Sequence, residues 1–284
     1  MKQTLTFFVV VLLVGGCLSP PIIDSSTLID NGSTNNTREL NSKRRKLPPE
    51  IVRHGNPNSQ QKALVIGNGD YDYSRLQNPV NDAKAMTDSL VNLGFYVTRA
   101  TNYDDRSMKG VVEDFEGSLP QNGVALFYFS GHGVQVDGEN FLLPVNNDII
   151  DREDKLPINA VSAQNVLAMM KNVNKGVNLL VLDACRDNPY KAKKKGGPRG
   201  LAGMDSPRGA LIAFATAPGQ VALDGDGYNG LYTSHLLDAL ENAKHKRIAD
   251  VFMEVQSPVL KKSNGTQEPW YQASFRNPFC FGGC

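Results

Sequence analysis

The sequence has almost no excess of charge and few residues of the kinds that bind metals. Its 284 residues include 30 Lys and Arg against 29 Asp and Glu, for a formal net charge of +1, with four Cys and four His. Because no basic excess attracts phosphate groups, we expect no nucleic acid partner. With 40% hydrophobic and 21% charged residues, the composition is typical of one large globular domain with a tail.

Several common motifs for metals, nucleotides and serine hydrolases are missing as well. No CxxC or HxxxH pattern offers ligands at zinc spacing, so we expect no metal. The stretch IGNGDYD (66–72) resembles a dinucleotide-binding loop, but position 72 is Asp where a third glycine would stand. Neither a Walker motif nor a GxSxG elbow occurs. We therefore expect the protein to work without a cofactor.

The first apolar stretch of the chain, residues 5–14, is too short to cross a bilayer. It follows the positive Lys2 and suits the apolar part of a signal peptide. The Val-Gly-Gly-Cys sequence that ends at Cys17 resembles the lipobox of bacterial lipoproteins. This resemblance implies that residues 1–16 are removed and that Cys17 is lipidated as the mature N-terminus. A plain secretory signal, cut near the same place, is the alternative.

A lipid anchor would hold the protein at a membrane of the bacterial cell envelope. Leu18 follows the cysteine where an aspartate would argue for retention at the inner membrane, which favours the outer membrane, on the periplasmic side. Secretion is the alternative.

Residues 17–60 are predicted to form a disordered tether. They are rich in Asn, Ser, Thr and Pro and show no hydrophobic periodicity. The basic run at 43–46 is explained most simply as a solvated segment, with contact to anionic lipid or proteolysis as alternatives.

From residue 61 onward, predicted strands alternate with predicted helices. We expect strands at 62–67, 95–100, 123–130, 176–184 and 209–217, and helices at 79–94, 105–117, 159–173, 230–243 and 247–260. This alternation predicts an α/β fold with a mostly parallel sheet covered by helices on both faces. Residues 61–284 would form one domain, interrupted by a basic loop at 187–209 that is too polar for the core.

His132 and Cys185 each follow a predicted buried strand. Sites in parallel sheets gather at the carboxyl ends of the strands, so the two side chains are expected to lie close together. A cysteine protease needs a thiolate, an imidazole and donors for the oxyanion, and the N–H groups of Gly133 and Cys185 are candidate donors. Taken separately, His132 could be a turn residue and Cys185 a small core residue.

Four segments resemble the caspase-like domain, in its order and spacing. They are ALVIGNGDY…LQNPVNDAKAM…LGF, ALFYFSGHGVQVDGENFLLP, NLLVLDACRDNPY and RGALIAFATAPGQVALDGDGYNGLYTSHLL, across residues 61–245. Within that family, the segments are most similar to those of bacterial metacaspases, also called orthocaspases. The resemblance implies a caspase-like α/β/α sandwich, cysteine endopeptidase activity and a His132/Cys185 catalytic dyad. The alternative is a non-proteolytic caspase-like interaction module on the bacterial envelope.

The resemblance also implies which substrates are cut. Metacaspases cleave after Arg or Lys because acidic residues line the S1 pocket, and the matching positions here are Asp82 and Asp183. Two carboxylates in a partly buried pocket would bind a guanidinium through charge-assisted hydrogen bonds. As alternatives, Asp82 could be a first-turn residue favoured by the helix dipole, and Asp183 could cap a turn.

The basic loop has a further implication from the same resemblance. Caspase-like zymogens are often cut between the cysteine and the following strand. A protease with basic specificity would find possible sites within 191–199 of its own loop, at Lys193, Lys194, Lys195 and Arg199. A solvated linker is the alternative.

Two further expectations concern the segment after the histidine and the remaining cysteines. VQVDGENFLLP (134–144) is predicted to form a short β-hairpin, and it is too poor in acids to require calcium. Cys280 and Cys284 could close a small disulfide ring in an oxidising compartment, which would leave Cys185 as a lone thiol.

Overall fold

A computed structural model describes residues 49–185, 201–205, 208–217, 222 and 227–284 of the chain. The predicted signal peptide (1–16), Cys17 and the tether up to residue 48 lie outside the described residues. So do four candidate cleavage sites, Lys193, Lys194, Lys195 and Arg199. No helix in the described ranges is long and apolar enough to cross a membrane.

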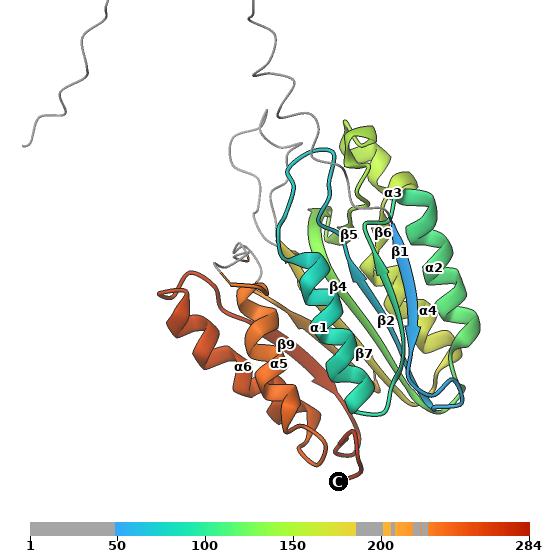
Figure 1. The fold of residues 1–284 in the computed structure, drawn as a ribbon, viewed down its shortest axis with the longest axis vertical. Coiled ribbons are helices and arrows are strands. Elements are labelled where there is room, and N and C mark those ends of the chain that lie inside the picture. The colour runs from blue at the N-terminus through green and yellow to red at the C-terminus, as the bar shows by residue number, and fades with distance from the viewer. Residues whose placement is uncertain (1–48, 186–200, 206–207, 218–221, 223–226) are drawn as a thin grey trace, which may run out of the picture. The chain divides into compact units, whose positions relative to one another are not determined.

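A central sheet runs through the domain in the strand order β1-β3-β2-β4-β7-β8-β9 (Figure 1). The strands are β1 (Glu50–His54), β2 (Gln61–Gly67), β3 (Tyr96–Thr101), β4 (Val124–Val136), β7 (Val177–Cys185), β8 (Ala210–Phe214) and β9 (Trp270–Ser274). The five strands from β3 to β8 are parallel, and the two edge strands β1 and β9 are antiparallel to their neighbours. Two short strands, β5 (Glu139–Leu142) and β6 (Val161–Ser162), extend β4 sideways.

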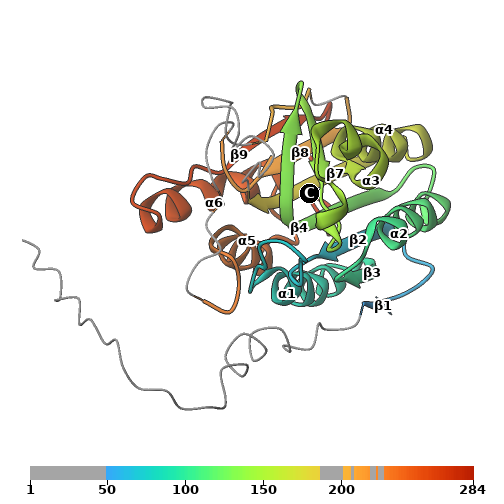
Figure 2. The ribbon, with the colours of Figure 1, turned by 90° about the horizontal axis from the view of Figure 1, so that it is seen from above.

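Helices cover both faces of this sheet, as Figures 1 and 2 show. One layer consists of α1 (Pro79–Asn92), α5 (Leu231–Glu241) and α6 (Ile248–Lys262), and the other of α2 (Asp105–Ser118) and α4 (Ala163–Val173), with the short α3 (Leu156–Asn159) beside it. The predicted α/β/α sandwich with a mostly parallel sheet is therefore confirmed.

The alternation of side chains along the strands explains the two layers. In β4, Leu126 and Tyr128 pack in the cluster under α1 and α5, whereas Phe127 and Phe129 pack in the cluster under α2 and α4. Both faces of such a strand are buried, so its sequence is almost continuously apolar. Burying each of these large side chains contributes about 1.5–3 kcal/mol to folding.

The structure corrects several predicted boundaries. The tether predicted for 17–60 does not extend that far, because residues 50–54 form β1 along β3. The helix predicted at 159–173 begins at Ala163, since residues 161–162 pair with β5 as β6. Strand β9 was not predicted at all.

One smaller prediction is confirmed, and one question that the sequence left open is answered. The segment after the histidine forms a β-hairpin, in which Val134 pairs with Phe141 and Val136 with Glu139. Cys280 and Cys284 are joined by a disulfide, and their Cα atoms lie 5.1 Å apart.

Candidate active site

The register of β4 and β7 brings the two proposed catalytic positions together. The strands pair in parallel, with Ser130 opposite Asp183 and His132 opposite Cys185. Neighbouring strands lie about 4.8 Å apart, so the backbones of His132 and Cys185 are adjacent at the carboxyl edge of the sheet. A sequence argument could place both residues at strand ends, but this register depends on the tertiary fold.

Position 131, directly before the histidine, requires a glycine because of its backbone conformation and because a neighbouring side chain lies close to it. Gly131 has a φ of +155°, and a Cβ there would lie 2.4 Å from the Tyr71 hydroxyl oxygen. That hydroxyl accepts a 2.8 Å hydrogen bond from the His132 backbone N–H. The close approach of Tyr71 therefore both excludes a side chain at position 131 and fixes the backbone of His132.

The glycine after the histidine leaves room for two neighbours. A Cβ at Gly133 would lie 3.1 Å from the Ala184 Cβ and 3.1 Å from a methyl carbon of Leu201. Leu201 is the first residue of the basic loop that the structure describes, and it is buried. The end of that loop thus packs against the histidine corner.

The imidazole of His132 makes one aromatic contact and one contact with a backbone carbonyl. Its ring centroid lies 4.4 Å from that of Tyr71, and its Nε2 lies 2.5 Å from the Ser74 carbonyl oxygen. A carbonyl can only accept, so this contact places a proton on Nε2. Nδ1 is then the ring nitrogen that can accept a proton during a reaction.

The Gly133 N–H is not used by the hairpin. Leu143 donates its N–H to the His132 carbonyl at 2.9 Å, and Gly133 stands opposite Leu142. In an antiparallel ladder, that pattern makes Gly133 and Leu142 a pair that exchanges no backbone hydrogen bonds. This geometry is compatible with the predicted role of the Gly133 N–H as an oxyanion donor.

Asp82 lies on α1 and is 1% exposed. Its Oδ1 accepts hydrogen bonds from the Gly230 N–H at 2.9 Å and the Asn229 side chain at 3.0 Å. Its Oδ2 accepts a bond from the Ser130 hydroxyl at 2.9 Å. Gly230 is the N-cap of α5, so the carboxylate also lies at the positive end of that helix.

Asp183 is 6% exposed and is bound to the first turn of α5. Its Oδ2 accepts a 2.5 Å hydrogen bond from the Thr233 hydroxyl, which in turn lies 2.5 Å from the Tyr128 hydroxyl. A threonine hydroxyl has a single proton, and here it is given to the carboxylate. Tyr128 must therefore donate its own proton to Thr233, so the hydrogen bonds run in one direction, from Tyr128 through Thr233 to Asp183.

Both acids affect the buried tyrosines beside them. Burial, followed by the charges of Asp82 and then Asp183, raises the pKa of Tyr128 well above its ordinary value of 10.0. Burial and the charge of Asp183 likewise raise the pKa of Tyr232. Both carboxylates therefore lie near one phenol, although they come from elements far apart in the sequence.

Sequence reasoning did not identify Tyr128, Ser130 or Thr233 as part of this site. A usable signal existed for two of them. Tyr128, Ser130 and His132 alternate along β4 and so share one face of the strand. No comparable signal existed for Thr233, because only the packing of α5 onto the sheet brings it to Asp183.

The structure identifies no metal site in the ranges it covers. No group of three or more His, Cys, Asp or Glu side chains within the described residues could hold an ion. His235 lies on α5 beside Asp238, with 3.7 Å between Nδ1 and the carboxylate. His54, predicted to lie in the tether, is in β1.

Comparison with known proteins gives a family match and two curated relatives. The sequence model of the Peptidase C14 family, described as the caspase domain, matches residues 60–280. The chain is 31% identical over 125 residues to mucosa-associated lymphoid tissue lymphoma translocation protein 1 of Homo sapiens, which is 44% of this chain and 15% of that protein. The homolog from Mus musculus is 31% identical over 141 residues, or 49% of this chain and 16% of the relative. The chain thus matches less than a fifth of the length of either relative.

Proposed function

Because the chain belongs to the caspase domain family, we propose that it is a cysteine endopeptidase that cleaves peptide bonds after Arg or Lys. In this proposal His132 and Cys185 are the catalytic pair. The observation that carries it is the register of β4 and β7, which sets His132 opposite Cys185 and Ser130 opposite Asp183.

The reaction would proceed through an acyl-enzyme. The Cys185 thiolate attacks the carbonyl carbon of the scissile bond, and the Gly133 and Cys185 N–H groups stabilise the oxyanion. His132 takes the thiol proton at Nδ1 and gives it to the leaving amine. A water molecule, deprotonated by His132, then attacks the thioester and releases the acid product and the thiol.

The preference for a basic P1 residue is supported by the acid pair. Asp82 and Asp183 are buried, and each is oriented by at least one hydroxyl hydrogen bond. Fixed carboxylates in a poorly solvated pocket bind a cation more strongly than exposed ones do. Their hydrogen bonds also fit a structural role in holding α5, so specificity must be measured directly.

The test is hydrolysis of peptides that carry aminomethylcoumarin after Arg, Lys or Asp. We expect release from the Arg and Lys peptides and none from the Asp peptide. Cys185→Ala and His132→Ala should each abolish release, and Ser234→Ala on α5 is the control. A pure, folded wild type that cleaves none of the peptides would contradict the proposal and favour a non-proteolytic module.

We also propose self-cleavage in the basic loop. The described flanks support it, because the loop leaves the sheet at Cys185 and, before β8 (Ala210–Phe214), brings Leu201 beside Gly133. Asn140 on β5 holds the returning chain through bonds of 2.7 and 3.0 Å to Ala202. Mass spectrometry of the wild type should find ends after Lys193, Lys194, Lys195 or Arg199 that Cys185→Ala lacks. Identical fragments from both proteins would refute it.

We propose, finally, that residues 1–16 are removed and that the protein is anchored to the bacterial envelope through lipidated Cys17, with residues up to 48 as the tether. The support is the sequence resemblance to a lipobox alone. Labelling with a clickable fatty acid should mark the wild type and not Cys17→Ala. Equal labelling of the two would rule out this anchor, and an unlabelled, secreted wild type would favour the plain signal.

A further inference from the structure

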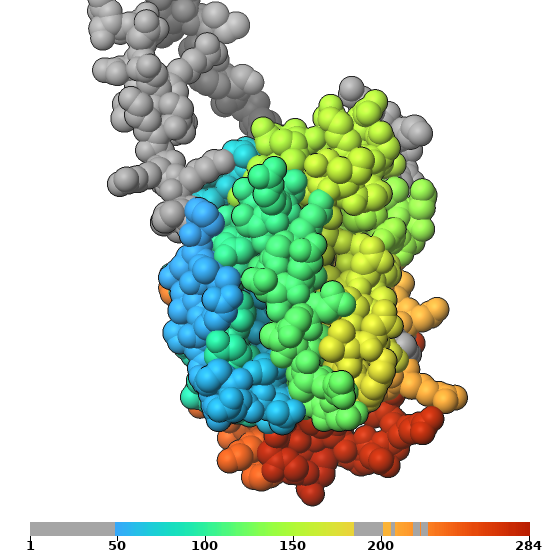
Figure 3. Space-filling view, turned by 90° about the vertical axis from the view of Figure 1, so that its right-hand side faces the viewer, coloured from blue at the N-terminus to red at the C-terminus, as the bar shows by residue number. Residues whose placement is uncertain are grey.

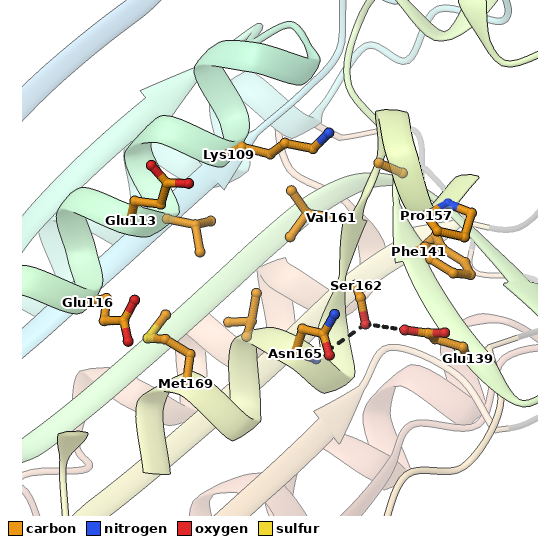
Figure 4. A pocket seen from close by; sticks show the side chains of 13 residues that line it. Lys109, Glu113, Glu116, Glu139, Phe141, Pro157, Val161, Ser162, Asn165 and Met169 are labelled. Atoms are coloured by element: carbon orange, nitrogen blue, oxygen red, sulfur yellow. Dashed lines mark hydrogen bonds between the residues drawn. The ribbon is translucent and has the colours of Figure 1, made fainter. Parts of the chain in front are cut away.

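A groove lies between α2 and α4 (Figures 3 and 4). These helices cover the face of the sheet opposite α1, which carries Asp82, and α5, which binds Asp183. It is an open groove with a volume of about 370 Å³, and residues of β5 and β6 form one end of it. Ligand pockets span about 300–1,000 Å³, so this one has room for a few side chains. None of its lining residues takes part in the proposed catalytic site.

Acidic side chains stand along the rim of the groove. Glu113 and Glu116 lie three positions apart on α2, and both are exposed. Neither forms an ion pair with any other described residue. Like charges at this spacing repel each other on a helix surface, so a cation placed between them would relieve the repulsion.

The other two charged groups of the rim are already bound. The Glu139 carboxylate on β5 accepts a 2.6 Å hydrogen bond from Ser162. The Lys109 ammonium donates to the Ile158 carbonyl. Three carboxylates against one ammonium leave the groove with net negative charge.

Between these acids lie several apolar side chains. Val112 comes from α2, Val166 and Met169 from α4, and Phe141 and Val161 from the strands. Val112 and Met169 are partly exposed to solvent. Methionine adapts its shape to different partners, so such a floor suits side chains that enter from outside.

This combination selects one class of ligand. The acidic rim would repel phosphate groups, which argues against nucleic acid and anionic lipid surfaces. No metal-binding group occurs among the described residues. A peptide with both cationic and apolar side chains would match the rim and the floor together.

We propose that this groove is a docking site for a Lys/Arg-bearing, amphipathic segment of another protein. The bound segment would contact Phe141 and Glu139 on β5, which pairs with β4 directly after His132. Leu143, the residue after β5, donates to the His132 carbonyl. Docking would therefore occur on a strand that supports the histidine corner.

The probe is a fluorescein-labelled peptide of alternating Lys and Leu, followed by anisotropy with the full chain carrying Cys185→Ala. Excess arginine amide is added to occupy the acid pair, so that binding there is not counted. We expect saturable binding to fall about tenfold when both Glu113 and Glu116 are changed to Lys, through loss of two attractive charge contacts and gain of repulsion. A peptide of alternating Glu and Leu should not bind.

The matched control is Asp238→Lys with Glu241→Lys, which reverses two exposed acids at the same spacing on α5. If this control loses as much affinity for the peptide as the α2 variant does, the loss reflects the net charge of the whole protein and not the groove, and the proposal fails. It also fails if the α2 variant binds like the parent, or if the parent does not bind. The milder Glu113→Gln, Glu116→Gln variant gives the same comparison if the reversal does not fold.

A second copy of the chain is the other occupant to be tested. If sedimentation shows a dimer that the α2 variant loses, the groove joins two copies and the partner proposed here is wrong. Because binding is measured without catalysis, its failure leaves the proposed peptidase activity untouched.

Discussion

Replacing Thr233 by Val tests whether the acid pair binds substrate or merely holds α5. Valine keeps the shape of the side chain and removes the hydroxyl that lies between Asp183 and Tyr128. A hydrogen bond to a charged group contributes about 1.5–3 kcal/mol, so the free energy of unfolding should fall by about that amount. For a domain of this size the melting temperature should fall by about 3–12 °C.

The kinetic effect follows from the freedom that the carboxylate gains. Without the Thr233 hydroxyl, the Asp183 side chain loses one of the contacts that orient it, and the additional ordering when substrate binds costs about 0.5–1.5 kcal/mol. KM for the Arg peptide should therefore rise about 2–10-fold, since each 1.36 kcal/mol is tenfold. Because the P1 contact persists in the transition state, kcat should change little.

Two control variants and the KM of Thr233→Val show whether Asp183 binds substrate or only holds α5. Thr233→Ser restores the hydroxyl and should restore KM, whereas Ser234→Ala removes a hydroxyl that bonds only the Leu231 carbonyl among the described residues. If Thr233→Val melts at a lower temperature but keeps the wild-type KM, Asp183 does not bind the P1 residue. The acid would then be a structural anchor of α5.

Three further predictions concern stability. Gly131→Ala should reduce the free energy of unfolding by about 1–3 kcal/mol, because the new Cβ meets the Tyr71 hydroxyl; an unchanged urea midpoint would contradict this. The pKa values of Tyr128 and Tyr232 are raised in the folded protein, so as the pH rises these phenols lose their protons in the unfolded chain before they do in the folded one. The contribution of the two phenols to the free energy of unfolding should therefore be complete below pH 10 and decrease above it, by up to about 1.4 kcal/mol per pH unit for each phenol. Tyr128→Phe should remove one such contribution from denaturant curves between pH 9 and 11, and an unchanged slope would contradict the assignment. Cys284→Ser removes the disulfide to Cys280 and should lower the free energy of unfolding by about 2 kcal/mol, which is the loop-closure entropy for so short a loop. A variant as stable as the wild type under oxidising conditions would refute this prediction.

The sequence predicted the inner strands well because their signal is local. Strands such as β4 and β7 are buried on both faces, so their apolar runs identify them whatever lies beside them. The edge strands gave no such signal. In β1, residues 50–54 are mostly exposed and follow two prolines, and their extended form depends on the bonds to β3.

In the candidate site as well, some residues could be predicted from local sequence and others could not. His132 and Cys185 could be named because each follows a predicted apolar strand, although the observed strands β4 and β7 extend far enough to include them, and the acids could be named from a family resemblance. The groups that orient those acids could not, because Gly230 and Thr233 lie about 150 and 50 positions away from the carboxylates they bind. Contacts at such separations are set by how α5 packs on the sheet.

By itself, the sequence determined the layered α/β architecture and the two buried strands that carry Gly-His-Gly and Asp-Ala-Cys. The tertiary structure decided the register that sets His132 opposite Cys185, the anchoring of Asp82 and Asp183 on α5, and the acidic groove between α2 and α4. The physical reason is that hydrophobic periodicity is a property of neighbouring residues, whereas strand register and helix packing depend on side chains that meet only when the whole core is formed.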